Sequence, residues 1–151
     1  MSLTKEEILV GLIGALEKTL WKVLGDKALA TVSVIGETFY DALVKRGLME
    51  MEESQALDTI SKFLTDELNV AESVSIKRDG TTISMEVKRC ILLDAEKELI
   101  NEGVKPFICP FMNLTAYVLR KRDKSLTRVK EINVDVESEI CHLEFEELSP
   151  K

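Results

Sequence analysis

Two cysteine-bearing segments late in the chain carry the residue types best suited to chemistry. Pro106–Tyr117 reads as a cysteine-led loop that runs into a short apolar helix, and Glu137–Phe145 reads as the turn and return strand of a β-hairpin. Cys109 and Cys141 stand in these segments, and Cys90 ends an earlier strand pattern. Thiolates hold zinc in a tetrahedral shell, but the chain has no C-x-x-C pair, and unpaired cysteine also packs as a small hydrophobe. The sequence therefore leaves open whether these cysteines are metal ligands or core residues.

Nucleophilic catalysis has little support, because the chain contains a single histidine, His142. A catalytic triad or a Cys-His dyad would have to use this residue. Strand alternation places His142 on the face opposite Cys141, and no elbow motif surrounds any serine. The glycines are scattered singly, mostly at expected helix ends, so neither a dinucleotide fingerprint nor a phosphate loop is present. These residues favour binding over catalysis.

The composition is that of an ordinary globular domain. The chain has 151 residues, of which 45% are hydrophobic and 31% charged, enough to bury a core. A formal net charge of -7 argues against a general binder of nucleic acid or anionic membranes. No apolar run approaches the ~20 residues that span a bilayer. Because three cysteines occur without a secretory signal, we expect one cytoplasmic domain over residues 1–151, without integral membrane association.

Helical periodicity dominates the first part of the chain. Thr4-Lys-Glu-Glu7 is a capping box that opens a helix over residues 4–24. Gly25 is expected to end this helix, and Asp26 to cap the next one. Further amphipathic helices are predicted up to Gly47 and over residues 53–68, 91–101 and 110–120.

Two later segments change to the period of two that strands have. The first surrounds Asp79-Gly80, a strong hairpin turn signal. The second has a return strand that puts Cys141, Leu143 and Phe145 on one face and His142 on the other. The expected fold is α+β, an antiparallel sheet of two hairpins (about residues 72–89 and 127–147) covered by amphipathic helices.

The first helix carries a broader apolar stripe than one core contact requires. The stripe consists of residues at helical spacing: Ile8, Leu9, Leu12, Ile13, Leu16, Leu20, Val23 and Leu24. It is buried within the domain, used as a homodimer interface, or forms one wall of an apolar cavity. Three small residues would let another helix approach closely: Gly11, Gly14 and Ala15. We expect the helix over residues 4–24 to take part in dimerisation.

The order of the final elements resembles the vinyl-4-reductase domain family, whose members are predicted to bind hydrocarbons or other apolar ligands. Residues 26–148 look like a whole domain of this type, and Gly25–Ala30 through Gly36–Tyr40 are similar in placement to the family's early helix. The helical N-terminus is similar to that of short stand-alone archaeal members. The resemblance implies the helix-covered sheet shared with subunits of membrane-tethering transport particles, commonly dimeric, with a cavity for an apolar molecule.

The resemblance also implies zinc, because cysteines and an acidic residue near the final hairpin hold zinc in some sensor members. Cys109 matches the helix-leading cysteine of those members, and Cys141 matches the terminal one. The further cysteine that they place after the first strand of the hairpin is missing from Ile132–Val136. The residues left to complete a site are the third cysteine, the histidine and nearby carboxylates: Cys90, His142, Glu137 or Glu139.

We therefore expect a homodimeric binding module for an apolar or amphipathic small molecule, which acts as a sensor, carrier or accessory protein and is not itself an enzyme. Pockets for such ligands are mostly apolar with a few polar anchors. The residues expected to line the pocket are large side chains of the helices: Phe39, Phe63, Phe111, Met112 and Tyr117. Two alternatives stay open. One is a structural adaptor without a cavity, and the other is a thiolate-dependent enzyme of tetrapyrrole or hydrocarbon metabolism.

Overall fold

Helices occupy the first part of the chain, and two hairpins alternate with helices after it. The computed structural model describes residues 2–48, 56–123 and 126–148. The helical elements are α1 (Lys5–Leu24), η1 (Gly25–Thr31), α2 (Val32–Lys45), α3 (Ala56–Lys62), η3 (Phe63–Glu67), α4 (Leu93–Asn101) and α5 (Pro110–Asp123). The strands are β1 (Ser73–Asp79), β2 (Thr82–Lys88), β3 (Leu126–Asp135) and β4 (Ile140–Leu148).

The two hairpins join into one four-stranded antiparallel sheet in the order β1-β2-β4-β3. The return strands of both hairpins, β2 and β4, are therefore the central strands, and Cys141 of β4 pairs with Val87 on one side and Val134 on the other. Gly80 has a φ of 60°, as the turn of the first hairpin requires. The predicted α+β fold with two hairpins is confirmed.

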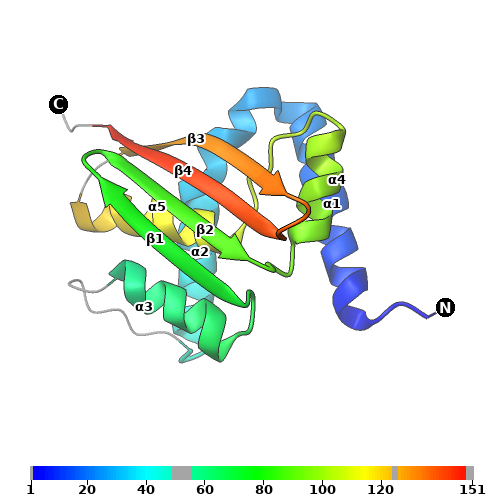
Figure 1. Ribbon diagram of the computed structural model, residues 1–151, viewed down its shortest axis with the longest axis horizontal. Coiled ribbons are helices and arrows are strands. Elements are labelled where there is room, and N and C mark those ends of the chain that lie inside the picture. Colours follow the sequence, from blue (N-terminus) through cyan, green and yellow to red (C-terminus); the bar gives the residue numbers. More distant parts are fainter. Residues whose placement is uncertain (1, 49–55, 124–125, 149–151) are drawn as a thin grey trace.

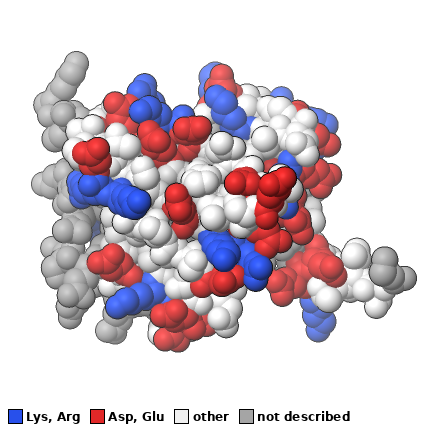
Figure 2. All heavy atoms as spheres, viewed as in Figure 1, with Lys and Arg blue, Asp and Glu red and all other residues white. Residues whose placement is uncertain are grey.

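One face of the sheet is covered by helices, and the other faces solvent. Ile83, Met85 and Phe145 point to the covered face and are at most 1% exposed. In Figure 1, α2 and α5 lie behind the sheet, and α1 and α4 lie side by side at one end of it. Figure 2 shows Lys, Arg, Asp and Glu side chains spread over the open face. The alternation of the strands therefore decides which side chains meet the interior.

The predicted start and end of the first helix are confirmed. The Thr4 hydroxyl accepts a hydrogen bond from the Glu7 N–H at 3.1 Å, and the Thr4 N–H donates to the Glu7 carboxylate at 2.7 Å. Gly25 ends α1 with a φ of 58°. The prediction that Asp26 caps the next helix was wrong. Residues 25–31 form a tighter 3-10 helix, so α2 begins only after Thr31, which makes no side-chain capping bond.

Helices α2 and α5 touch through their backbones at Gly36. A Cβ atom built on Gly36 would lie 1.9 Å from the Asn113 carbonyl oxygen and 2.9 Å from the Tyr117 Cβ. Only a residue without a side chain fits such an approach. This contact fixes α5, and with it the cysteine that leads into α5, against α2.

Two further expectations from the sequence can be compared with the structure only over the described residues. The helix predicted over residues 53–68 is present from Ala56 as α3 and η3, and its first residues lie outside the described ones. Among the described ranges, no helix is both long and apolar enough to cross a membrane.

Replacing Gly36 by alanine should destabilise the protein by about 3 kcal/mol or more, because overpacking against backbone leaves no flexible atom to move aside. Urea unfolding followed by circular dichroism measures the change. Gly11→Ala is the matched control, because a Cβ there meets no described heavy atom within 4 Å. It should stabilise α1 by about 0.5–1 kcal/mol. Equal midpoints for the two variants would contradict the close approach of α2 and α5.

Candidate functional site

The three cysteines of the chain come from distant segments and are all buried free thiols. Cys90 follows β2, Cys109 precedes α5, and Cys141 lies in β4 on the covered face of the sheet. The three thiols lie close enough to shift one another's pKa, and that of the Glu96 carboxyl on α4, through their charges and hydrogen bonds. The fold therefore gathers three thiols and one carboxyl in its interior.

Cys90 is held by backbone hydrogen bonds on both sides of it. The Arg89 N–H donates to the Glu139 carbonyl at 2.9 Å, and the Ile91 N–H donates to the Val70 carbonyl at 2.8 Å. Arg89 has a φ of 51°, an unusual value for a side chain of its size. The connection between β2 and α4 is thus fixed rather than free to move Cys90.

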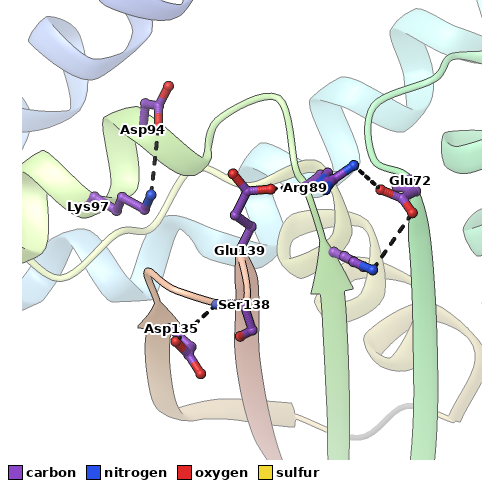
Figure 3. Close-up of polar contacts among 8 residues, drawn as sticks. Glu72, Arg89, Asp94, Lys97, Asp135, Ser138 and Glu139 are labelled. Atoms are coloured by element: carbon purple, nitrogen blue, oxygen red, sulfur yellow. Dashed lines mark hydrogen bonds and ion pairs between the residues drawn. The ribbon is translucent and has the colours of Figure 1, made fainter.

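A network of ion pairs reinforces this connection on the outside (Figure 3). Arg89 pairs with Glu72 at 3.1 Å and with Glu139 at 2.7 Å, and Lys88 lies 3.8 Å from Glu72. These side chains are 43–62% exposed, so each pair adds little to stability by itself. Together they link the start of β1, the end of β2 and the turn before β4.

Cys141 is positioned by the turn between β3 and β4. The Asp135 carboxylate accepts hydrogen bonds from the Glu137 and Ser138 N–H groups at 3.1 and 3.3 Å. Figure 3 shows the contact between Asp135 and Ser138. The side-chain hydrogen bond from Ser138, followed by the backbone bond from Ser138, lowers the pKa of Asp135, because these bonds favour its charged form. Burial, followed by the nearby Glu96 carboxyl, raises the pKa of the Cys141 thiol well above its usual value.

Cys109 is anchored by the amide of Asn113, one turn into α5. The Asn113 Oδ1 accepts a hydrogen bond from the Cys109 N–H at 2.8 Å. Its Nδ2 donates to the carbonyls of Val32 and Phe107 at 3.1 and 2.9 Å. This buried amide therefore joins the cysteine-led loop to α2, and it also joins two residues of that loop, Phe107 and Cys109.

Glu17 of α1 holds the same loop from the other side. It is 1% exposed, and its Oε1 accepts hydrogen bonds from the Phe107 N–H at 2.6 Å and the Ile108 N–H at 2.9 Å. Burial raises the pKa of Glu17, and the two N–H groups partly offset that rise. Glu17 thus has a structural task, which is to fix the backbone that carries Cys109.

Glu96 has no comparable support. It is 1% exposed, and neither of its carboxylate oxygens has a partner at ordinary hydrogen-bond geometry within the described part of the chain. Burial, followed by repulsion from Cys90, raises its pKa well above the usual carboxyl value, and the Cys141 and Cys109 thiols only partly offset that rise. Burial therefore disfavours the charged form of this carboxyl.

Cys90 and Cys109 form a hydrogen-bonded pair of thiols. The bond lowers the pKa of Cys90 and raises that of Cys109 well above its usual value, because the Cys109 thiol keeps its proton and donates it toward the Cys90 sulfur. Burial of Cys109 acts in the same direction. Cys90 is thus the thiol of this pair from which a proton is lost more easily.

The predicted metal ligands are only partly brought together. Cys90, Cys109 and Cys141 meet, whereas His142 lies on the open face of the sheet, with its Nδ1 3.5 Å from the Glu86 carboxylate. The carboxyl beside the thiols is that of Glu96, which sequence reasoning missed. As the side chains stand, no group of three or more His, Cys, Asp or Glu among the described residues is arranged to hold a metal ion.

A signal for Glu96 and Glu17 was present in the sequence. Each is a single acidic residue on the inward face of an amphipathic helix. Glu96 lies between Leu93 and Leu99, and Glu17 lies one turn after Ile13. A charged residue on an apolar stripe requires a partner or a function, because burying an unpaired charge is costly.

The residues predicted to line a ligand pocket lie mainly in the core. Phe111 and Met112 are fully buried, Tyr117 is nearly so, and Phe39 and Phe63 are partly buried. A groove of about 480 Å³ runs between η1, the start of α2 and the edge of the sheet. The residues that line it include Leu29, Ala30, Val32, Ala116, Leu126 and Val129. The predicted pocket lining stays a prediction.

Comparison with known proteins corrects the resemblance drawn from the sequence. No curated protein matches the chain. A family model described as "Putative rubredoxin C-terminal domain" matches residues 8–149, which include all three cysteines, Glu17 and Glu96. The likeness to the vinyl-4-reductase domain family, drawn from the order of a few late elements, was therefore wrong. The chain belongs to the Putative rubredoxin C-terminal domain family.

Proposed function

We propose that this protein is a binding module that holds a thiophilic metal ion, zinc in the first place, on Cys90, Cys109, Cys141 and Glu96. The observation that carries the proposal is the Glu96 carboxyl, which is buried next to three thiols and has no partner at ordinary hydrogen-bond geometry among the described residues, apart from weak contacts with the thiols of Cys141 and Cys109. A buried ionised carboxylate is favourable only when it is paired or binds a metal.

The donor set fits the chemistry of such an ion. Zinc takes thiolate sulfur and carboxylate oxygen in a tetrahedral shell of four ligands, and a shell filled by protein side chains is typical of structural sites. The family description associates the domain with rubredoxin, which also favours a metal. Binding would require the thiols to lose their protons and to turn from one another toward a common point.

The role of the bound ion would be structural. It would link the end of β2, the start of α5, β4 and α4, which meet at these four residues and are far apart in sequence. The surrounding polar groups serve this arrangement. Glu17 and Asn113 fix the loop that carries Cys109, and the Arg89 network fixes the connection that carries Cys90.

The first test measures metal content and affinity in untagged protein. We expect about one zinc per chain, and Co²⁺ substituted for it should show the visible absorption of thiolate ligation. Cys141→Ser and Glu96→Gln should each weaken zinc binding by at least about tenfold. Loss of a group that only supports a metal ligand already lowers metal affinity by about 10- to 100-fold. His142→Ala is the control and should bind as the wild type does, because His142 lies on the open face. Absence of metal from the wild type, or equal loss in all three variants, would contradict the proposed site.

The second test uses metal-free protein and the pH dependence of stability. Because the folded-state pKa of Glu96 is raised, its destabilising effect is absent below the unfolded carboxyl pKa of about 4.3 and grows as the pH rises. The unfolding free energy of Glu96→Gln should therefore gain on that of the wild type between about pH 5 and about pH 7.5, by about 1–3 kcal/mol. Glu98→Gln, at an exposed position on the same helix, should show no such gain. A constant difference across this pH range would show that Glu96 is not a buried, unpaired acid.

A second candidate function is the binding of an apolar small molecule, and the groove along η1 and α2 favours it. Its volume of about 480 Å³ is that of a small-molecule site, and its lining is mostly aliphatic. A carrier or sensor role would place the ligand in this groove and the metal in the interior. A thiolate-dependent enzyme and a structural adaptor without a ligand remain the alternatives.

A small aromatic hydrocarbon, naphthalene, serves as the probe for the groove. Binding to the native state should raise Tm with increasing probe concentration. Ala30→Trp, which places an indole at an exposed position in the groove, should abolish that rise. Thr38→Trp, at an exposed position of α2 outside the groove lining, should keep it. If both tryptophan variants respond as the wild type does, the groove is not the binding site.

A further inference from the structure

The groove beside η1 and the start of α2 follows strand β3, which forms one edge of the four-stranded sheet. Its space of about 480 Å³ adjoins a second space of about 190 Å³, and Leu29 and Val129 line both. Together the two spaces follow β3 from Leu126 to Ile132. Seven strand residues extend over roughly 20 Å, so the groove suits an elongated ligand better than a compact one.

One end of this groove is apolar. Leu126 at the start of β3 is 63% exposed, and Leu148, its partner at the end of β4, is 41% exposed. Both line the larger space, and the buried side chains of Val32 and Ala116 line it from the interior. Large aliphatic side chains that remain exposed in a groove favour an apolar occupant at this end.

The other end of the groove carries positive charge. Lys105, in the loop before α5, and Lys130 of β3 line the smaller space together with one carboxylate, that of Glu131. Lys130 pairs with Glu144 at 3.1 Å. Lys105 is exposed and takes part in no ion pair with the described residues. The ammonium group of Lys105 can therefore pair with a bound anion.

The sequence around β3 differs in charge from the rest of the chain. Residues 120–130 contain six Lys or Arg and one Asp, whereas the whole chain has a net charge of -7. Arg128 lines the larger space, and its guanidinium pairs with Glu146 of β4. A groove lined mainly by cations in an acidic protein attracts anions and repels other cations.

The edge of β3 is poorly suited to an added peptide strand. Its register with β4 shifts between Val129 and Glu131, which marks a bulge. Bulges and charged side chains on an edge strand oppose pairing with a further strand, and Arg128, Lys130 and Glu131 surround this bulge. The groove therefore favours a small molecule over a polypeptide segment.

We infer that the groove along β3 binds a single-chain aliphatic carboxylate, with its head group at Lys105 and its tail toward Leu126 and Leu148. This inference rests on the groove proposed above as a small-molecule site, and it names the chemical class of the ligand. Each CH₂ group of the tail that becomes buried lowers Kd by about fourfold. The carboxylate sets the direction of the ligand, because the unpaired lysine lies at one end of the groove and the exposed leucines at the other.

Calorimetric titration of the full chain with decanoate and with decan-1-ol tests the preference for an acid. A groove without a cation would bind the alcohol more tightly, because a carboxylate loses more hydration on burial. The wild type should instead bind decanoate about threefold to fivefold more tightly at low salt, the range of one exposed ion pair. Lys105→Met should remove this preference. Lys77→Met is the matched control and should keep it, because Lys77 is exposed on β1, at the opposite edge of the sheet.

The length of the acid tests the direction of binding. Leu126→Ser should weaken the binding of dodecanoate by at least about threefold, because its tail loses aliphatic contact. The same variant should leave octanoate unchanged, because a shorter tail held at Lys105 ends before Leu126. Lys105→Met should weaken the binding of both acids by the same factor.

Three results would overturn the inference. If decanoate binds no more tightly than decan-1-ol, or if Lys105→Met keeps the preference, the head group is not held at Lys105. If decanoate binds Ala30→Trp as it binds the wild type, the acid lies outside the groove. If naphthalene binds in the groove and neither aliphatic probe does, the inference fails while the groove function stands. Both fail when none of the three probes binds.

Discussion

Burial of the Glu96 carboxyl is the constraint on which the rest of the interior depends. A carboxyl surrounded by apolar side chains is stable only when it is protonated, hydrogen-bonded or bound to a cation. Glu17, the other buried glutamate among the described residues, accepts two backbone N–H groups and so has a fixed structural partner. Glu96 instead faces sulfur atoms, which are weak hydrogen-bond donors. The contrast separates a residue that builds the fold from one that is suited to binding.

The polar groups around the thiols form a scaffold that is complete without any ligand. Asn113 uses its oxygen and both of its N–H donors, and its helix is pressed against α2 at Gly36. The ion pairs of Arg89 hold the other end of the site. Because these supports come from α1, α2 and both hairpins, the positions of the cysteines are set by most of the domain rather than by a local motif. The backbone that carries the thiols is therefore held in place, although among the described residues the side chains themselves are not arranged to share a metal ion.

The two faces of the sheet and the two sides of α1 divide the molecule by the same physical rule. A residue on the covered face of the sheet meets helices, whereas its neighbour in sequence meets solvent, so Cys141 belongs to the interior and His142 to the surface. Along α1 the side that faces the core closes the domain, and the other side leaves aliphatic surface exposed at Ile8, Leu9, Leu12 and Leu16. The open face of the sheet carries charged side chains (Figure 2), so of these two outward surfaces that of α1 is the more apolar.

Local patterns in the sequence determined the elements and the fold class. The capping box at Thr4, the turn at Asp79-Gly80 and the period of two in the later strands depend on residues close together in the chain, and each predicted the structure that is present. The same alternation correctly separated Cys141 from His142. The family was misjudged because the order of a few short elements does not by itself identify a family. Only the tertiary structure decided which cysteines meet, that Glu96 joins them, and that Glu17 supports their loop. Those contacts join residues far apart in the chain, and periodicity, which reports burial but not the identity of the neighbour, carries no information about them.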